Sequence, residues 1–239
     1  MSDLQPQREW IARLVRHDTT SRTSNLNLLE DVESYLNEHG IRSSRVTNED
    51  ETKANLYFTV GPPVEGGVIL SGHTDVVPVD DQPWNSDPWT VVELDGKLYG
   101  RGTADMKSFS AIGLSLIPEM LAAGLKRPIH FALSYDEEVG LLGAPAMINE
   151  IKDKVPTPSA VIVGEPSDMQ VVDGHKGIAV FRTDITGQEA HSSQPHRGVS
   201  AVMAAGRLMA KITEMTDRRR DEASTMSPFE PPYTTMSVG

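Results

Sequence analysis

Three short apolar segments of the sequence, at residues 68–71, 131–135 and 161–163, are each followed directly by acidic or imidazole side chains. Short apolar runs bounded by turn residues are typical of buried strands. The carboxyl ends of parallel strands meet at one edge of a sheet, which is where open α/β folds place their ligands. The pattern therefore predicts that five side chains lie together at one sheet edge: His73, Asp75, Glu137, Glu138 and Glu165.

Helical and strand-like patterns alternate along the first two thirds of the chain. Apolar residues at helical spacing predict helices over residues 10–15, 29–36, 105–124 and 143–151, with Pro118 kinking the third or shifting its ends. Further runs predict strands over residues 41–46, 55–60, 128–135 and 160–164, the last of them buried. This alternation predicts an α/β fold with a mostly parallel sheet and helices on both faces.

The pattern changes near Gly177. Residues 178–185 alternate as a half-exposed strand does, residues 199–215 have helical spacing, and residues 233–238 are strand-like. We therefore expect a catalytic domain over residues 1–176 and the start of an incomplete α+β domain over residues 177–239.

Composition removes several classes of function. The 239 residues include no cysteine, which excludes disulfides, thiol nucleophiles and thiolate metal sites. The net charge of −12 argues against binding to nucleic acid or to an anionic membrane surface. No apolar run approaches the ~20 residues that span a bilayer, and the first residues lack a signal-peptide pattern, so a cytoplasmic location is expected.

A loop over residues 100–107 presents Asp105 before a predicted helix and adds another carboxylate to the expected sheet edge. Each of these motifs alone is more often an ordinary polar turn, but together they crowd carboxylates around one imidazole. Crowded anions destabilise one another unless cations are bound. Histidine and carboxylate ligands without sulfur favour a pair of zinc ions, with cobalt or manganese as substitutes, and hydrolysis of an amide bond.

Four segments carry a resemblance to a known family: residues 71–78, 100–107, 136–140 and 164–166. They resemble the co-catalytic two-zinc metallohydrolases, which include aminoacylases, glutamate carboxypeptidases, succinyl-diaminopimelate desuccinylases and acetylornithine deacetylases. Within that family, residues 73–88 look most like the acetylornithine deacetylases. The resemblance implies a zinc-peptidase-like catalytic domain with an inserted lid and dimerisation domain.

The resemblance also implies the metal ligands. His73 and Glu165 would bind the first zinc, Glu138 would bind the second, and Asp105 would bridge the two.

Three further roles follow from the same resemblance. Asp75 would orient the His73 imidazole, and Glu137 would act as general base. Residues 187–193 match the lid motif of the family, in which His191 would reach the active site of a partner subunit and stabilise the oxyanion.

The implied reaction is hydrolysis of N-acetylornithine to ornithine and acetate in arginine biosynthesis, by a homodimer acting on a small N-acyl amino acid. The alternatives are another N-acyl-amino-acid hydrolase, such as a desuccinylase or aminoacylase, and a truncated, non-catalytic relative. Family members continue beyond the position of Gly239 and supply a last zinc-binding histidine from that region. We therefore expect the 239-residue chain alone to be nearly inactive, to hold its second metal weakly and to self-associate.

Overall fold

The computed structural model describes residues 4–239, and the chain forms two compact units. The first unit ends at Met169 and the second comprises Gln170–Gly239. Each unit is described by itself.

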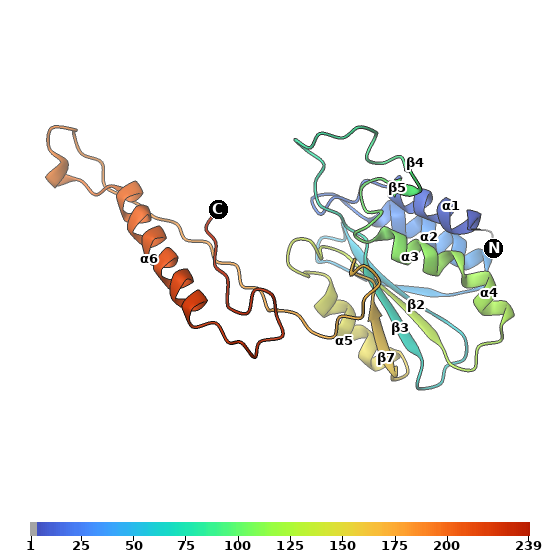
Figure 1. The fold of residues 1–239 in the computed structure, drawn as a ribbon. Helices are drawn as coiled ribbons and strands as arrows, with labels where there is room; N and C mark the ends of the chain where they lie inside the picture. The colour runs from blue at the N-terminus through green and yellow to red at the C-terminus, as the bar shows by residue number, and fades with distance from the viewer. Residues whose placement is uncertain (1–3) are drawn as a thin grey trace. The chain divides into compact units, whose positions relative to one another are not determined.

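A five-stranded sheet forms the centre of the first unit (Figure 1). Its order is β1-β2-β6-β3-β7, with the strands at Ser43–Thr47, Ala54–Val60, Ile129–Ser134, Val68–His73 and Ala160–Val163 respectively. Strand β3 is parallel to β6 and β7, whereas β2 is antiparallel to β1 and β6. Four strands therefore run in one direction and β2 alone runs against them, which confirms the predicted mostly parallel α/β sheet.

The register places the carboxyl ends of three strands side by side. His73 at the end of β3 pairs with Ser134 at the end of β6, and Ser71 pairs with Val163 at the end of β7. The loops that follow these strands begin at the same sheet edge, as the sequence predicts.

Helices cover both faces of the sheet. Helices α1 (Gln5–Val15), α2 (Leu26–Glu38), α3 (Lys107–Ser115) and α4 (Ile117–Ala122) lie on one face, and α5 (Ala144–Lys154) lies on the other (Figure 1). A small hairpin, β4 (Val92–Leu94) and β5 (Lys97–Tyr99), precedes α3. The predicted helix over residues 105–124 is divided between α3 and α4 at Leu116, because Pro118 has no N–H to continue the hydrogen-bond ladder.

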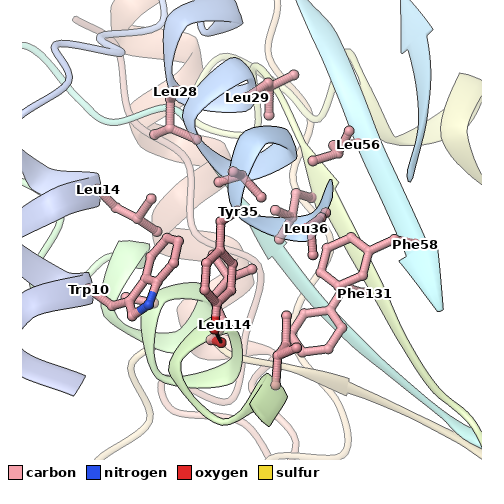
Figure 2. Packing of buried hydrophobic residues seen from close by; sticks show 14 of the residues in the cluster. Trp10, Leu14, Leu28, Leu29, Tyr35, Leu36, Leu56, Phe58, Leu114 and Phe131 are labelled. Atoms are coloured by element: carbon pink, nitrogen blue, oxygen red, sulfur yellow. Dashed lines mark hydrogen bonds between the residues drawn. The ribbon is translucent and has the colours of Figure 1, made fainter. Parts of the chain in front are cut away.

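The main hydrophobic core lies between the sheet and α1–α4 (Figure 2). Alternate residues of β6 point to opposite faces: Phe131 and Leu133 belong to this core, while Ala132 packs with Met147 of α5. The Phe131 ring stacks on Phe58 of β2, with ring centroids 4.5 Å apart. Burial of each large side chain contributes roughly 1.5–3 kcal/mol, so the strands that carry the site are firmly held.

Strand β7 differs from the sequence prediction in its burial. The prediction of a strand is confirmed, but Val161, Ile162 and Val163 are about half exposed. The reason is the place of β7 in the sheet: among the described residues it is an edge strand that pairs with β3 alone.

The second unit contains a 3₁₀ turn, Pro195–Arg197, and one long helix, α6, over Ala201–Asp221. The predicted helix over 199–215 is confirmed, and Ser200 caps it by accepting a hydrogen bond from the Met203 N–H. The strands predicted over 178–185 and 233–238 are wrong, because the described residues of this unit form no ladder. Alternation alone does not make a strand without a partner for its backbone. Nowhere in residues 4–239 does a helix combine the length and the apolarity needed to cross a membrane.

Candidate metal centre

His73, the last residue of β3, lies at the centre of the site and is only 2% exposed. Its ring Nδ1 lies 2.8 Å from the backbone carbonyl oxygen of Asp75. A carbonyl oxygen only accepts hydrogen bonds, so Nδ1 must be the donor. This fixes the ring orientation and leaves Nε2 directed at the carboxylates, as a ligating histidine requires.

Negative charge around the ring changes its protonation. Burial by itself lowers the pKa of His73, but the Asp75 side chain and the charge of Glu165 outweigh burial and raise the pKa to about 9. The surroundings of Nε2 therefore favour positive charge there, which in a metal complex would be supplied by the ion.

Two carboxylates from different loops approach His73 Nε2 directly. The Asp105 Oδ1 atom lies at 3.0 Å and the Glu165 Oε1 atom at 3.7 Å. Two groups of three side chains have their ligand atoms within 4.8 Å of one another. One group is His73, Glu137 and Glu165, and the other is His73, Asp105 and Glu138.

The negative charges of the carboxylates in these groups repel one another when no cation is bound. Burial raises the pKa of Glu138, and the Asp105 charge raises it further. Burial also raises the pKa of Glu165, with the charges of Asp105 and Glu137 adding to the effect. A divalent ion would remove this repulsion, and a donor set of one imidazole with carboxylates and no sulfur suits zinc. The residues present therefore fit the metal that the sequence predicts.

Asp75 links the histidine to the loop after β6. Its carboxylate accepts hydrogen bonds from the Ser21 hydroxyl at 2.6 Å and from the backbone N–H groups of Glu137 and Glu138 at 3.0 and 3.3 Å. Burial opposes ionisation, but hydrogen bonds from His73, Ser21 and the Glu137 N–H lower the pKa of Asp75. Asp75 therefore stays charged and contacts the backbone that carries two further acids.

Two glycines allow the loops to approach so closely. A Cβ on Gly72 of β3 would lie 2.9 Å from Met106 Cε and 3.0 Å from Ser110 Oγ, so α3 packs tightly against this strand. A Cβ on Gly164 would overlap the Phe109 ring. Glycine at these positions lets Asp105, two residues before α3, and Glu165, directly after Gly164, reach the same imidazole.

The structure brings together six of the seven predicted site residues, all in the first unit: His73, Asp75, Asp105, Glu137, Glu138 and Glu165. The seventh, His191, belongs to the second unit, where its exposed ring Nδ1 lies 2.8 Å from Ser193 Oγ and accepts the Ser193 N–H. Its role remains a prediction.

Sequence reasoning missed a buried lysine beside the site. Lys107 is 1% exposed and donates from Nζ to the backbone oxygen of His17 at 2.7 Å. Burial lowers its pKa to about 7, although the charges of Asp18 and Asp75 oppose that change. Its position directly after Asp105 and Met106 was the one available signal, and that signal does not distinguish a buried lysine from an exposed one.

Comparison with known proteins agrees with this geometry. The family described as Peptidase family M20/M25/M40 matches residues 69–237. A protein of Pasteurella multocida (strain Pm70), named acetylornithine deacetylase, is 35% identical over 217 residues, covering 90% of this chain and 56% of that protein. A second of the same name, from Shigella sonnei (strain Ss046), is 38% identical over 187 residues, covering 78% and 48%. The chain thus spans about half the length of these curated relatives.

Solved structures show the same fold at low sequence identity. A tripeptidase from Staphylococcus aureus has a TM-score of 0.59 at 19% identity, covering 87% of this chain and 56% of that one. The aminopeptidase PepT from Bacillus cereus also has a TM-score of 0.59, at 20% identity, covering 87% and 57%. The family match covers well over half of the chain, and the sheet-edge carboxylates lie within it. The chain is therefore a member of peptidase family M20/M25/M40, a family of hydrolases.

Proposed function

We propose that this chain forms the metal-binding part of an enzyme that hydrolyses N-acetylornithine to ornithine and acetate in arginine biosynthesis. The observation that carries the proposal is the convergence of four carboxylates on His73 in two potential ligand groups. The specific substrate is supported by the two relatives named acetylornithine deacetylase, at 35% and 38% identity.

His73, Asp105, Glu138 and Glu165 would hold two zinc ions, with Asp105 as the ligand that both would share. Asp105 and Glu165 both lie close to His73 Nε2, and Glu138 shares a group with Asp105. Bound zinc would polarise the acyl carbonyl and lower the pKa of water, and cobalt or manganese would be workable substitutes.

Glu137 is the proposed general base. Its carboxylate lies in the His73 and Glu165 group, and its backbone N–H is fixed by Asp75. In the reaction, the water oxygen bonds to the acyl carbon while Glu137 accepts the water proton. The carbon–nitrogen bond then breaks, and Glu137 passes that proton to the leaving amine.

Assembly and location belong to the same proposal. The enzyme would be a homodimer in the cytoplasm, with a catalytic domain over residues 1–176 and a lid and dimerisation domain from residue 177. His191 of the lid would stabilise the oxyanion in the active site of the partner subunit. The substrate would be a small N-acyl amino acid, and neither nucleic acid nor a membrane would be a partner.

Metal uptake is the first test. Purified protein loaded with zinc or cobalt and freed of loose ions should contain bound metal, and Asp105→Ala should lose most of it. Asp153→Ala removes an exposed acid of α5 and serves as the matched control. Unchanged metal content in Asp105→Ala would refute the bridging role.

Turnover is the second test. In a version of the enzyme that spans the full length of the curated relatives, a panel of N-acetyl, N-succinyl and longer N-acyl amino acids should show the highest kcat/KM for N-acetylornithine. Glu137→Gln should lower kcat by ~10²–10⁴-fold while metal stays bound. A preference for an N-succinyl or longer acyl substrate would favour the desuccinylase or aminoacylase alternative. Bound metal with no turnover of any member would favour a non-catalytic relative.

A further inference from the structure

Several buried polar side chains of the N-terminal segment lie close to the metal centre. Thr19, Thr20, Ser21 and Asn25 are all buried, although they precede the first strand and lie outside the residues that the family match covers. A buried polar group destabilises the fold unless it forms hydrogen bonds, so the hydrogen-bond partners of these side chains indicate their role. Thr19 and Asn25 bond Thr74, and Ser21 bonds Asp75, so three of the four have partners directly after His73 in the chain.

Ser21 contacts the centre through Asp75. The Ser21 backbone N–H donates to the Val76 carbonyl oxygen at 3.2 Å, and its hydroxyl donates to Asp75 Oδ2 at 2.6 Å. The backbone of Ser21 is therefore bound to Val76, the residue after Asp75, while its side chain binds the Asp75 carboxylate. Hydrogen bonds to a charged acceptor are roughly twice as strong as neutral ones.

Lys53 contacts the centre through the loop after β6. Its Nζ lies 2.7 and 2.8 Å from the two carboxylate oxygens of Asp136 and also donates to the Ser21 carbonyl oxygen. The two side chains are only 14% and 10% exposed. Separating the two charges of such an ion pair is unfavourable, because each would be left as an uncompensated charge in a partly buried place. The pair therefore holds both side chains in position.

Asp136 has a backbone conformation that needs such support. Its φ of 53° lies in the left-handed region, where residues other than glycine are uncommon. This turn directly precedes Glu137 and Glu138, whose N–H groups point at Asp75. The ion pair with Lys53 therefore holds the turn that directs two acids towards the centre.

These contacts form a closed ring. Lys53 joins Ser21 to Asp136, Ser21 joins Asp75, and Asp75 accepts the N–H groups of the residues that follow Asp136. Asn25 reinforces the ring, because its amide bonds both the Ala54 backbone, next to Lys53, and Thr74 Oγ1.

We propose that Lys53 and Ser21 are positioning residues that, by holding Asp136 and Asp75, set the geometry of the metal ligands His73 and Glu138. The inference rests on the metal centre of the proposed function and not on its particular substrate. Neither side chain touches the proposed ligand atoms, so both act through the two aspartates. Loss of an outer-shell hydrogen bond typically weakens metal binding by ~10–100-fold.

The test measures Co²⁺ binding and the visible absorption spectrum of the bound ion in the full chain, together with the free energy of unfolding. Ser21→Ala and Lys53→Met should each weaken Co²⁺ binding by ~10–100-fold and change the spectrum. Ser24→Ala is the control for the serine, because the Ser24 hydroxyl bonds the Thr52 carbonyl oxygen at an exposed position. Arg45→Met is the control for the lysine, because it breaks another partly buried ion pair, between Arg45 of β1 and Glu33 of α2.

Both controls should keep parental Co²⁺ affinity, even where Arg45→Met loses as much unfolding free energy as Lys53→Met. Unchanged affinity and spectrum in Ser21→Ala would overturn the inference, and this milder variant decides the matter if Lys53→Met does not fold. Equal loss of affinity in Arg45→Met would also overturn it, because the effect would then be general destabilisation. A parent protein that binds no Co²⁺ would refute the metal centre and the inference together. Normal Co²⁺ binding, together with no turnover of N-acetylornithine by a version that spans the full length of the curated relatives, would refute only the substrate.

Discussion

Gly164 offers a direct test of how β7 delivers a ligand to the metal centre. The glycine follows the last residue of β7, donates its N–H to the Ser71 carbonyl oxygen at 3.1 Å, and precedes Glu165. A methyl group at this position would overlap the Phe109 ring of α3. The change Gly164→Ala should therefore push α3 and the end of β7 apart.

The size of the effect follows from the contact. Carbon atoms rest about 3.5–4.0 Å apart, so the ring or the strand must move by more than ~1 Å to accept the methyl group. The collision is with the base of the ring at Cγ, which cannot swing away without moving the α3 backbone or changing the Phe109 rotamer. Overpacking of this kind costs roughly 1–3 kcal/mol. A shift of ~1 Å at Glu165 should also weaken metal binding by ~10-fold or more.

The assay is a double-mutant cycle with Phe109→Ala, in which urea unfolding and Co²⁺ titration are measured for all four proteins. With the ring removed, Gly164→Ala should cost less than ~0.5 kcal/mol, giving a coupling energy of ~1–3 kcal/mol. Gly174→Ala is the control, because a Cβ there has no atom within 4 Å. Additive effects of the two substitutions would refute the close packing of Gly164 against Phe109.

Four further outcomes are expected. Burial opposes ionisation of Asp31, but hydrogen bonds from Arg13 and His17 lower its pKa to about 2. Asp31→Asn should therefore lower the free energy of unfolding in urea by roughly 1–2 kcal/mol at pH 7. This difference between the two proteins should shrink as the pH falls from about 4 to 2. Burial lowers the pKa of His130, so unfolding free energy should fall as pH drops below about 6.5, and less steeply in His130→Leu. Phe131→Ala should cost ~3–5 kcal/mol by the same assay, because the ring is buried against Phe58. Zinc at ~1,000 times its Kd should raise the unfolding free energy by ~4 kcal/mol, and EDTA should abolish that gain; equal melting temperatures with and without EDTA would contradict it.

The parts of the fold that sequence could predict are those with local causes. The apolar runs before His73, Glu137 and Glu165 are buried or paired strands of one sheet, so their ends meet by a general rule of parallel sheets. The break near Pro118 is equally local, because a missing N–H acts on its own helix.

The failures have non-local causes. Residues 178–185 alternate as a strand does, but Ile178 and Phe181 are 90% and 87% exposed, because the described residues of that unit provide neither a ladder partner nor an apolar layer. Ser21 contacts Asp75 only because residues 18–25 fold back beside Val76, and Lys53 is joined to it through the Ser21 carbonyl oxygen. No periodicity or motif in those residues indicates that return.

The proposed ligands are widely separated in sequence, and this separation links metal occupancy to folding. His73 and Glu165 stand 92 positions apart, and they approach each other only when β3 and β7 are paired. An unfolded chain has no preformed site, so the amount of bound metal depends on the fraction of molecules that are folded. At limiting zinc, a core substitution remote from His73 that leaves an appreciable fraction of the molecules unfolded would lower occupancy and could be mistaken for loss of a ligand. Metal content in this protein should therefore always be read against the unfolding free energy of the same variant.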